Sequence, residues 1–327
     1  MSKKFALPLV AAVLLSLVAA APRPVARESF LPPNNLKIPV STMGNKGITR
    51  DQYDAVMDRM QALYGPIVAA RGGTLVINRL WDDETVNASA ERQGNNYVIN
   101  MYGGLARHPA ITQDGMALVA CHEMGHHLGG APKYGGMDWA SNEGEADYFA
   151  NSKCLHRVFA DSNSKSFTRM ASDDEIAAKA CAASFKTSGE RAICTRSAAA
   201  GMSVTQLFRA LRQQDAQPHY DTPDPKQVTE MFDAHPETQC RLDTYYQASL
   251  CSAPFTQDIG ETDPAVGACT RSQGYKSGMR PQCWYLPPAN EPTSSLDGAF
   301  AARTTPTHSV NSSTLASLKG LDVFSGL

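Results

Sequence analysis

The sequence has no large excess of either charge and no cluster of basic residues. Its 327 residues include 30 Lys and Arg against 32 Asp and Glu, which gives a formal net charge of −2 at pH 7. Proteins that bind nucleic acids present a positively charged patch to the phosphates, so no nucleic acid is expected as a partner. The sequence also lacks internal repeats of the kind that build solenoids and propellers.

Apolar runs long enough to span a membrane are absent after the first twenty residues. The run from Phe5 to Ala20 follows Lys3 and Lys4 and ends in small residues, which is the layout of a secretory signal peptide. We therefore predict a signal peptide over residues 1–20 and a mature chain that is exported, either periplasmic or secreted, and has no membrane span. An uncleaved anchor is the alternative, and the lack of a cysteine after the run argues against a lipoprotein.

Eight cysteines follow this predicted export signal. In an exported chain they indicate an oxidising compartment and up to four disulfides. Spacing along the chain predicts three close pairs: Cys181 with Cys194, Cys240 with Cys251, and Cys269 with Cys283. Cys121 and Cys154 remain, and a bond between them would join two predicted helices.

Hydrophobic spacing predicts one helix, three short strands and then further helices. Residues 49–70 carry apolar side chains at helical spacing behind Thr49, a suitable N-cap. Turn-forming residues separate the β-like runs, which are TLVINRL, TVNASAE and NYVINMYGGL. Two helices are predicted next, over residues 114–130 and 142–159, and the chain is predicted to be mostly helical from after Asp173 to Cys251. This order predicts an α+β fold with a small antiparallel sheet and a mostly helical C-terminal half.

Composition divides the chain around that domain, which we place at residues 48–252. Residues 21–47 are rich in Pro and Asn and are interpreted as a linker or a pro-segment. Residues 253–285 are predicted to form a small disulfide-closed appendage. Residues 286–327 are rich in Pro, Ser, Thr and Ala, which predicts a disordered tail.

The predicted helix over residues 114–130 contains an HExxH motif. His122 and His126 are four residues apart, so both side chains project from one helical face and can reach a single ion. In a zinc hydrolase the intervening glutamate, here Glu123, is not a ligand but takes a proton from the attacking water. A chance match on an amphipathic helix is the alternative, so the surrounding sequence must decide.

A catalytic zinc needs a third protein ligand, and three positions compete for that role. The metzincin spacing would place it at Pro132, which has no ligating atom. Glu143 precedes Asp147 by four residues, so one carboxylate can bind the ion while the other orients a ligating imidazole. Glu145 lies elsewhere on the helix and would close a capping box with Asn142. These arguments favour Glu143 over Glu145.

Two neighbouring side chains have the chemistry of zinc ligands but point in other directions on the helix. His127 projects away from His122 and is expected to be packed or solvated. Cys121 directly precedes the first ligand, and in an exported chain we expect it to form a disulfide.

Three segments in the right order resemble the gluzincin metallopeptidases of the CaaX-prenyl-protease and HtpX-like group. The resemblance covers residues 95–245 and begins with NYVINMYGGL followed by the HExxH helix. It continues with NEGEADYFA and ends with DAHPETQCRL, which is similar to the family's His-Pro-x-x-x-x-Arg motif. The resemblance implies a zincin-like domain that holds one Zn²⁺ per chain, with Glu143 as third ligand and Asp147 in support. The family's membrane members have several spanning helices, whereas none is expected in this chain after the signal peptide. The chain is therefore similar to the soluble exported members.

These parts predict a zinc endopeptidase that acts on peptides or unfolded proteins. A substrate would pair by β-augmentation with the strand formed by Asn96, Tyr97, Val98, Ile99 and Asn100. His235 is the candidate donor to the oxyanion, and Arg241 would orient His235 or a nearby carboxylate. The alternative is that HPETQCR merely starts a helix.

Two other interpretations stay open at this point. The chain could be a non-proteolytic binding or chaperone-like protein that keeps zinc for structure, with Cys121 or His127 as a fourth ligand. It could also be a zymogen in which residues 21–47 or the C-terminal tail cover the cleft.

Overall fold

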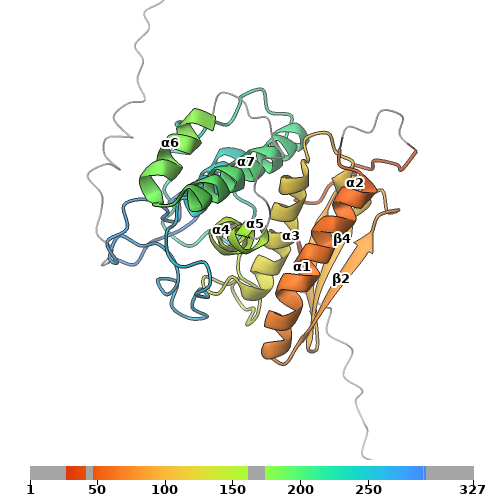
Figure 1. Cartoon of the computed structure of the whole chain (residues 1–327), viewed down its shortest axis with the longest axis horizontal. Helices are drawn as coiled ribbons and strands as arrows, with labels where there is room; N and C mark the ends of the chain where they lie inside the picture. Colours follow the sequence, from red (N-terminus) through yellow and green to blue (C-terminus); the bar gives the residue numbers. More distant parts are fainter. Residues whose placement is uncertain (1–26, 42–46, 161–173, 290, 292–327) are drawn as a thin grey trace, which may run out of the picture.

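The computed structural model describes residues 27–41, 47–160, 174–289 and 291. The predicted signal peptide and nearly all of the predicted tail lie outside these ranges. The described chain has an α+β architecture, in which a small sheet lies beside a mostly helical body (Figure 1). Within the described ranges, no helix combines the length and the apolar character that crossing a bilayer requires.

The sheet contains four strands in the order β1-β3-β4-β2. The strands are β1 (Arg27–Ser29), β2 (Thr74–Leu80), β3 (Ala88–Gln93) and β4 (Asn96–Tyr102). β3 pairs antiparallel with both β1 and β4, whereas β2 runs parallel to β4. The prediction of an antiparallel sheet is therefore wrong for β2, because the chain crosses over after β2 and the β3–β4 hairpin returns beside it. β1 was not predicted, since a three-residue strand is too short to show a period.

β4 lies inside the sheet, with β3 on one side and β2 on the other. The register pairs Ile99 with Ala90 of β3 and with Ile77 of β2. The backbone of Asn96, Tyr97, Val98, Ile99 and Asn100 is thus paired on both sides. The prediction that a substrate pairs with this strand by β-augmentation is wrong, because that mode of binding needs a free sheet edge.

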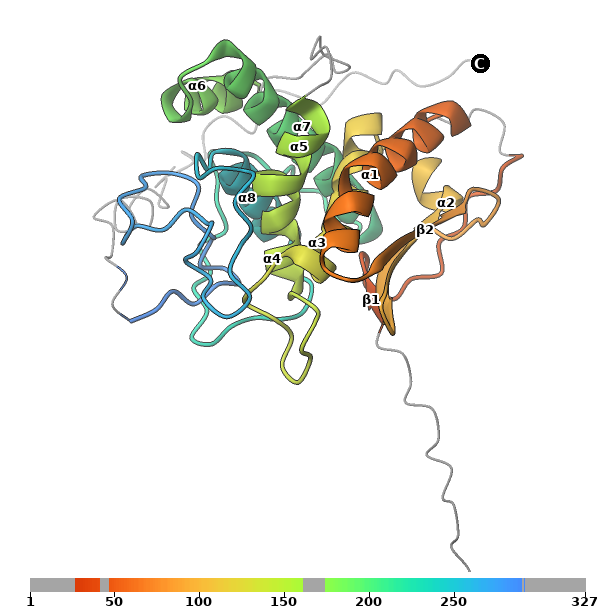
Figure 2. The same cartoon turned by 60° about the horizontal axis from the view of Figure 1, so that its bottom comes forward.

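Two helices, α1 (Arg50–Ala70) and α3 (Gln113–Leu128), pack against the sheet and against each other (Figure 2). α1 begins as predicted, since Thr49 and Gln52 form a reciprocal capping box. Its apolar stripe is buried, and the buried side chains are Tyr53, Val56, Met57, Met60, Tyr64 and Val68. This packing fixes α3, the helix with the HExxH motif, between the sheet and the other helices.

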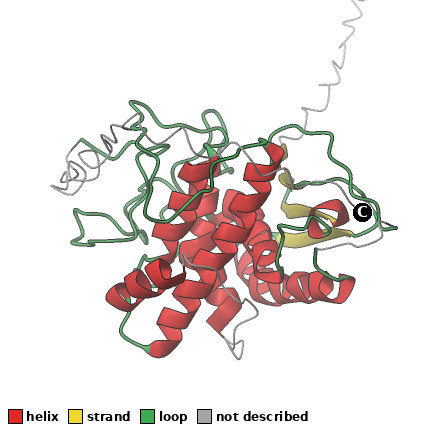
Figure 3. Ribbon diagram, turned by 90° about the horizontal axis from the view of Figure 1, so that it is seen from above, coloured by secondary structure: helices red, strands yellow, loops and turns green. Residues whose placement is uncertain are grey.

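The short helix α2 (Gly103–Ala106) directly follows β4 on the sheet side of the molecule. The remaining helices gather on the far side of α3 from the sheet (Figure 3), and they are α4 (Glu143–Phe149), α5 (Leu155–Ala160), α6 (Asp174–Ser184), α7 (Ser188–Leu211) and α8 (Thr238–Ser249). A π-helical segment, η1 (Ala150–Cys154), joins α4 to α5, so the helix predicted over residues 142–159 is present with one wide turn inside it. Residues 212–237 contain no regular element, and the predicted helical half is interrupted there.

Four disulfides connect these elements: Cys121–Cys154, Cys181–Cys194, Cys240–Cys283 and Cys251–Cys269. The first two pairs confirm the predictions, and the other two predicted pairs are wrong. Cys240 lies in the first turn of α8 and Cys251 lies beyond its end, so helical rise separates them by about 16 Å. A disulfide needs Cα atoms less than about 7 Å apart.

The segment 253–285 is consequently fastened to α8 rather than closed on itself. Its Trp284 is fully buried and donates a hydrogen bond from Nε1 to Thr244 Oγ1 of α8, at 2.9 Å. Taken together, the four disulfides indicate an oxidising compartment outside the cytoplasm.

Candidate metal centre

His122 and His126 come from α3, whose limits are set by local sequence. The side chain of Thr112 accepts a hydrogen bond from Gly115 N at the start of the helix. At the other end the chain leaves the helix through Gly130, whose φ of 74° suits a residue without a Cβ. Between these limits the two imidazoles occupy one face a turn apart, with ring centroids separated by 4.7 Å. Both side chains are fully buried.

Each imidazole is held by a hydrogen bond at Nδ1. His122 Nδ1 lies 2.7 Å from Asp147 Oδ1, and His126 Nδ1 lies 2.9 Å from the carbonyl oxygen of Ser141. Because both acceptors take a proton from Nδ1, the lone pair of each ring is on Nε2. Neither Nε2 atom has a hydrogen-bond partner within the described ranges.

Glu143 supplies the third donor to the space where the two Nε2 atoms meet. Its Oε2 lies 3.4 Å from His122 Nε2, and its Oε1 lies 3.7 Å from His126 Nε2. Two ligand atoms at zinc-bonding distance in a tetrahedral site are separated by about 3.3 Å, so this spacing fits a metal. Tyr134 donates a hydrogen bond to Glu143 Oε1 at 2.9 Å. The buried group formed by His122, His126 and Glu143, hereafter the metal centre, could hold a metal ion.

A glycine on α3 allows the third ligand to approach this closely. Gly125 faces the backbone of Ala146, and a Cβ at position 125 would lie 2.8 Å from two of its atoms. α4 therefore crosses α3 at nearly direct backbone contact. Since Glu143 is the first residue of α4, after the N-cap Asn142, this crossing places its carboxylate beside the two imidazoles.

The electrostatic environment of the metal centre favours positive charge. Burial lowers the pKa of His122, but the carboxylates of Asp147 and Glu143 outweigh it and raise that pKa to about 9. Burial raises the pKa of Glu143, yet His235 and the two ligand histidines hold it well below its ordinary value. His126 has a pKa lowered to about 4, because burial and the charge of His122 oppose a second proton. The same negative electrostatic environment would stabilise a divalent cation bound by these atoms.

Asp147 connects the metal centre to α8. Arg241 donates two hydrogen bonds to its carboxylate, from Nε at 2.8 Å and from Nη2 at 2.7 Å. Tyr245, one turn later on α8, donates from its hydroxyl to Asp147 Oδ1 at 2.8 Å. All three side chains are fully buried. Arg241 was predicted to orient either His235 or a nearby carboxylate. The structure shows it in contact with a carboxylate, that of Asp147.

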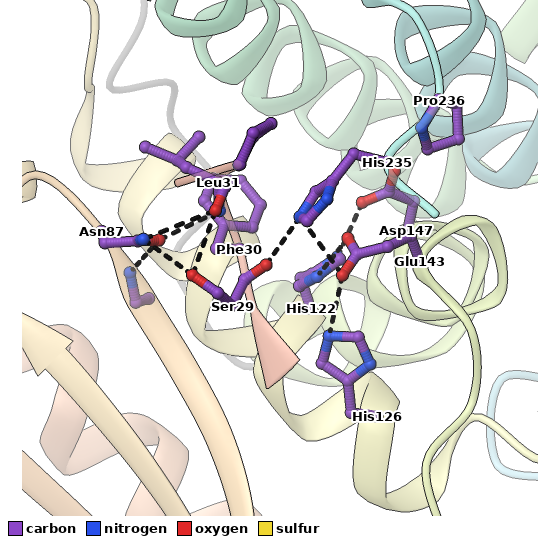
Figure 4. A network of polar contacts seen from close by, with 12 residues as sticks. Ser29, Phe30, Leu31, Asn87, His122, His126, Glu143, Asp147, His235 and Pro236 are labelled. Carbon is purple, nitrogen blue, oxygen red and sulfur yellow. Dashed lines mark hydrogen bonds and ion pairs between the residues drawn. The ribbon is translucent and has the colours of Figure 1, made fainter. Parts of the chain in front are cut away.

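His235 lies at the edge of the metal centre, with its side chain 21% exposed. Its Nε2 is 2.7 Å from the carbonyl oxygen of Ser29 and 3.4 Å from Glu143 Oε1 (Figure 4). Pro236 follows and Glu237 occupies the N-cap position of α8, so the His-Pro segment does begin a helix, as the alternative interpretation stated. The two interpretations are compatible, because the same segment also brings His235 and Arg241 to the site.

The side chains that competed for the metal are engaged elsewhere. Glu145 forms a buried bidentate ion pair with Arg280, at 2.5 and 2.7 Å, and so does not close the predicted capping box. Only half of that box is present, in which Asn142 accepts from Glu145 N. Cys121 is in a disulfide, and His127 Nε2 lies 3.1 Å from Val98 O. Neither closes a structural site as a fourth ligand.

Glu123 is fully buried on α3, directly after His122. Sequence reasoning did not find three groups that contact the site residues: the Ser141 carbonyl beside His126, the Tyr134 hydroxyl beside Glu143 and the Tyr245 hydroxyl beside Asp147. The position of Tyr245, four residues after Arg241, places both on one face of α8 and is the signal that could have found it. A backbone carbonyl such as that of Ser141 leaves no trace in the sequence.

Substituting the two neighbouring glutamates should separate metal binding from folding. We expect Glu143→Ala to lose bound metal, because it removes a donor atom. Glu145→Ala should keep its metal and lose about 3–5 kcal/mol of unfolding free energy, since Arg280 is left buried without its partner. Metal per chain by mass spectrometry and urea unfolding measure the two effects. If Glu145→Ala does not fold, Glu145→Gln gives the same comparison. Loss of metal in the Glu145 variant but not in Glu143→Ala would make Glu145 the third ligand instead of Glu143.

Searches with this chain found no matching family model, curated protein or solved structure.

Proposed function

We propose that this chain is an exported zinc-dependent endopeptidase that hydrolyses bonds in peptides or unfolded proteins. The observation that carries the proposal is the convergence of the His122, His126 and Glu143 donor atoms within 4.8 Å of one another. Two nitrogen donors and one carboxylate form the ligand set typical of a catalytic zinc, which leaves a coordination position for water. Glu123 completes the HExxH motif on the same helix.

The residues around the metal centre have distinct roles in this proposal. A bound zinc ion would supply Lewis acidity, lowering the pKa of water and polarising a peptide carbonyl. Glu123 takes the proton of the attacking water and passes it to the leaving amine. His235 donates a hydrogen bond from Nε2 to the oxygen that gains charge on the substrate, at the position where it now meets Ser29 O. Asp147 and Arg241 hold the His122 ring in orientation.

The resemblance to gluzincins supports the proposal through residues that come together in space. His235 and Arg241 belong to the third resembling segment, and they lie beside Glu143 and Asp147 of the second. Membership of that family is part of the proposal, as is the preference for peptides.

A second candidate function is a zinc-stabilised binding or chaperone-like protein without proteolytic activity. The complete burial of His122, His126 and Glu143 favours it, because structural metal sites are closed to solvent. The engagement of Cys121 and His127 elsewhere argues against it, since neither can provide a fourth ligand.

Metal removal tests the proposed function directly. We expect the purified chain to contain about one zinc ion, as one His₂Glu site implies. Dialysis against a chelator should abolish the hydrolysis of casein and of a quenched fluorescent peptide, and added zinc should restore it. A chelated sample that received magnesium instead of zinc is the control. Zinc-loaded protein that hydrolyses no peptide, whether intact or after removal of its N-terminal residues, would favour the binding protein.

A further inference from the structure

The residues Arg27–Leu31, hereafter the N-terminal strand segment, form one edge of the sheet. β1 pairs antiparallel with the outer edge of β3, where Ser29 is opposite Ser89. The pairing continues for one residue past β1, because Phe30 N donates to Ala88 O at 3.1 Å. The segment therefore occupies the sheet edge in the way that an extended peptide does in β-augmentation.

This segment ends directly beside the metal centre. The Ser29 carbonyl accepts a hydrogen bond from His235 Nε2 at 2.7 Å, and the Phe30 carbonyl accepts one from Arg241 Nη1 at 3.1 Å. The Phe30 ring meets the His122 ring edge-on, with centroids 4.9 Å apart. Figure 4 shows Ser29 and Phe30 lying between Asn87 and His235, close to His122.

Side chains of the body hold the segment in this position. Phe30 and Leu31 are fully buried. Asn87 accepts from Leu31 N at 3.0 Å and donates to Ser29 Oγ at 2.7 Å. Phe30 also packs against Phe208 of α7, with ring centroids 5.3 Å apart. The segment thus combines strand pairing with buried side chains, as peptide ligands of sheet edges do.

The N-terminal strand segment occupies hydrogen-bond donors of His235 and Arg241 that lie beside the metal centre. The ligand side chains are fully buried, and β4 is paired on both sides. β4 lies between β3 and β2, and the outer edge of β3 is the one that the N-terminal strand segment covers. The other edge of the sheet is formed by β2, on the far side of β4 from β3.

We propose that the outer edge of β3 is the peptide-binding edge of the metal centre, and that the N-terminal strand segment occupies it as an intramolecular competitor of substrate. This inference rests on the proposed function and names the regulation of that site. A tethered segment acts at an effective concentration in the millimolar range. Cutting the tether and diluting the protein to about 1 μM lowers that concentration about a thousandfold, so the edge becomes free for substrate.

The exposed residues Pro33, Asn34 and Asn35 allow the tether to be cut after the protein has folded. A recognition sequence for a site-specific protease, inserted between Pro33 and Asn34, lies in a surface loop where insertions are tolerated. Hydrolysis of a quenched fluorescent peptide is measured on the zinc-loaded chain before and after the cut. We expect the rate to rise about tenfold or more after cutting and dilution. A synthetic peptide of residues 21–33 should then restore inhibition, and its Phe30→Ala version should inhibit less.

A locked variant provides the matched control. Ser29 and Ser89 are cross-strand partners, so Ser29→Cys with Ser89→Cys can tie the segment to β3, as checked by peptide mapping. The locked chain should stay inactive after the same cut, because the segment cannot leave. A locked and cut chain as active as the unlocked one would overturn the inference.

The outcomes separate this inference from the proposed function. Equal hydrolysis before and after the cut, with no inhibition by the added peptide, would leave the peptidase in place and overturn the inhibitory role of the segment. Zinc-loaded protein without hydrolysis in either form would contradict the proposed function itself. Circular dichroism of the cut protein confirms that the fold survives, so that a low rate is not due to unfolding.

Discussion

A Glu123→Gln variant is expected to bind zinc as the wild type does and to lose peptide hydrolysis by about 10²–10⁴-fold, the usual contribution of a general base. Glutamine has the size and shape of glutamate, so packing on α3 is preserved. Its amide cannot take a proton from water. The donor atoms of His122, His126 and Glu143 are untouched, and metal content should therefore stay the same. The expected loss is in kcat, with KM nearly unchanged.

The measurement pairs zinc per chain with kcat and KM on a fluorescent peptide, for Glu123→Gln and for a matched variant, Glu230→Gln. Glu230 is exposed and lies outside the metal centre, so its substitution removes the same charge without touching the site. Its kinetics should match the wild type. Unaltered cleavage by Glu123→Gln would contradict the assignment of the base. No cleavage by the wild type, with zinc bound, would instead favour the zinc-stabilised binding protein.

The metal centre could be predicted from the sequence because it depends mainly on helical periodicity. His122 and His126 are one turn apart on a single helix, and that relation needs no knowledge of the fold. Glu143 was separated from Glu145 by the direction in which each projects from the next helix. The structure brings the donor atoms of His122, His126 and Glu143 together, and it places Glu145 against Arg280 instead.

Contacts between distant parts of the chain could not be predicted in the same way. Arg280 meets Glu145 across 135 residues, and Phe30 O meets Arg241 across 211. Such pairs have no periodic signature, because they depend on how the loops return to the body. The same limit explains the sheet: strand lengths and alternation predicted β2, β3 and β4 but not the order that places β4 inside.

The cysteine pairs show where spacing succeeds and where it fails. Cys181 and Cys194 lie on neighbouring helices joined by a short turn, so proximity in sequence gives proximity in space. Cys240 and Cys251 lie at the two ends of one rigid helix. For these cysteines the helix itself prevents the nearest pairing, and partners come from residues 253–285.

An Arg241→Met variant is expected to lose a large part of the unfolding free energy. Arg241 is fully buried, and its guanidinium is bound to the Asp147 carboxylate through two nitrogens. Burial raises the pKa of Asp147, and Arg241 with His122 outweighs it, so the carboxyl is held ionised. Removing the cation leaves that charge without its main partner, at an expected cost of about 3–5 kcal/mol. Urea unfolding of metal-free protein measures it.

The same substitution should weaken zinc binding, because Asp147 is the acceptor for His122 Nδ1. Loss of a group that orients a metal ligand typically costs 10–100-fold in metal affinity, and we expect a decrease of about that size. Arg280→Met is the matched control, since Arg280 is also buried and bidentate to a carboxylate, that of Glu145. It should lose comparable stability and keep its zinc affinity. Equal zinc affinities in the two variants would contradict an orienting role for Arg241.

Combining Arg241→Met with Asp147→Asn should separate the two roles of this pair. In the double variant no unpaired charge is buried, so part of the lost unfolding free energy should return. Zinc affinity should not return, because an amide oxygen is a weaker acceptor than a carboxylate and no longer raises the basicity of His122. Recovery of stability without recovery of zinc binding would assign Arg241 to the charge balance and Asp147 to the orientation of the ligand. If zinc binding returned together with stability, the weakened site of Arg241→Met would be explained by unfolding alone.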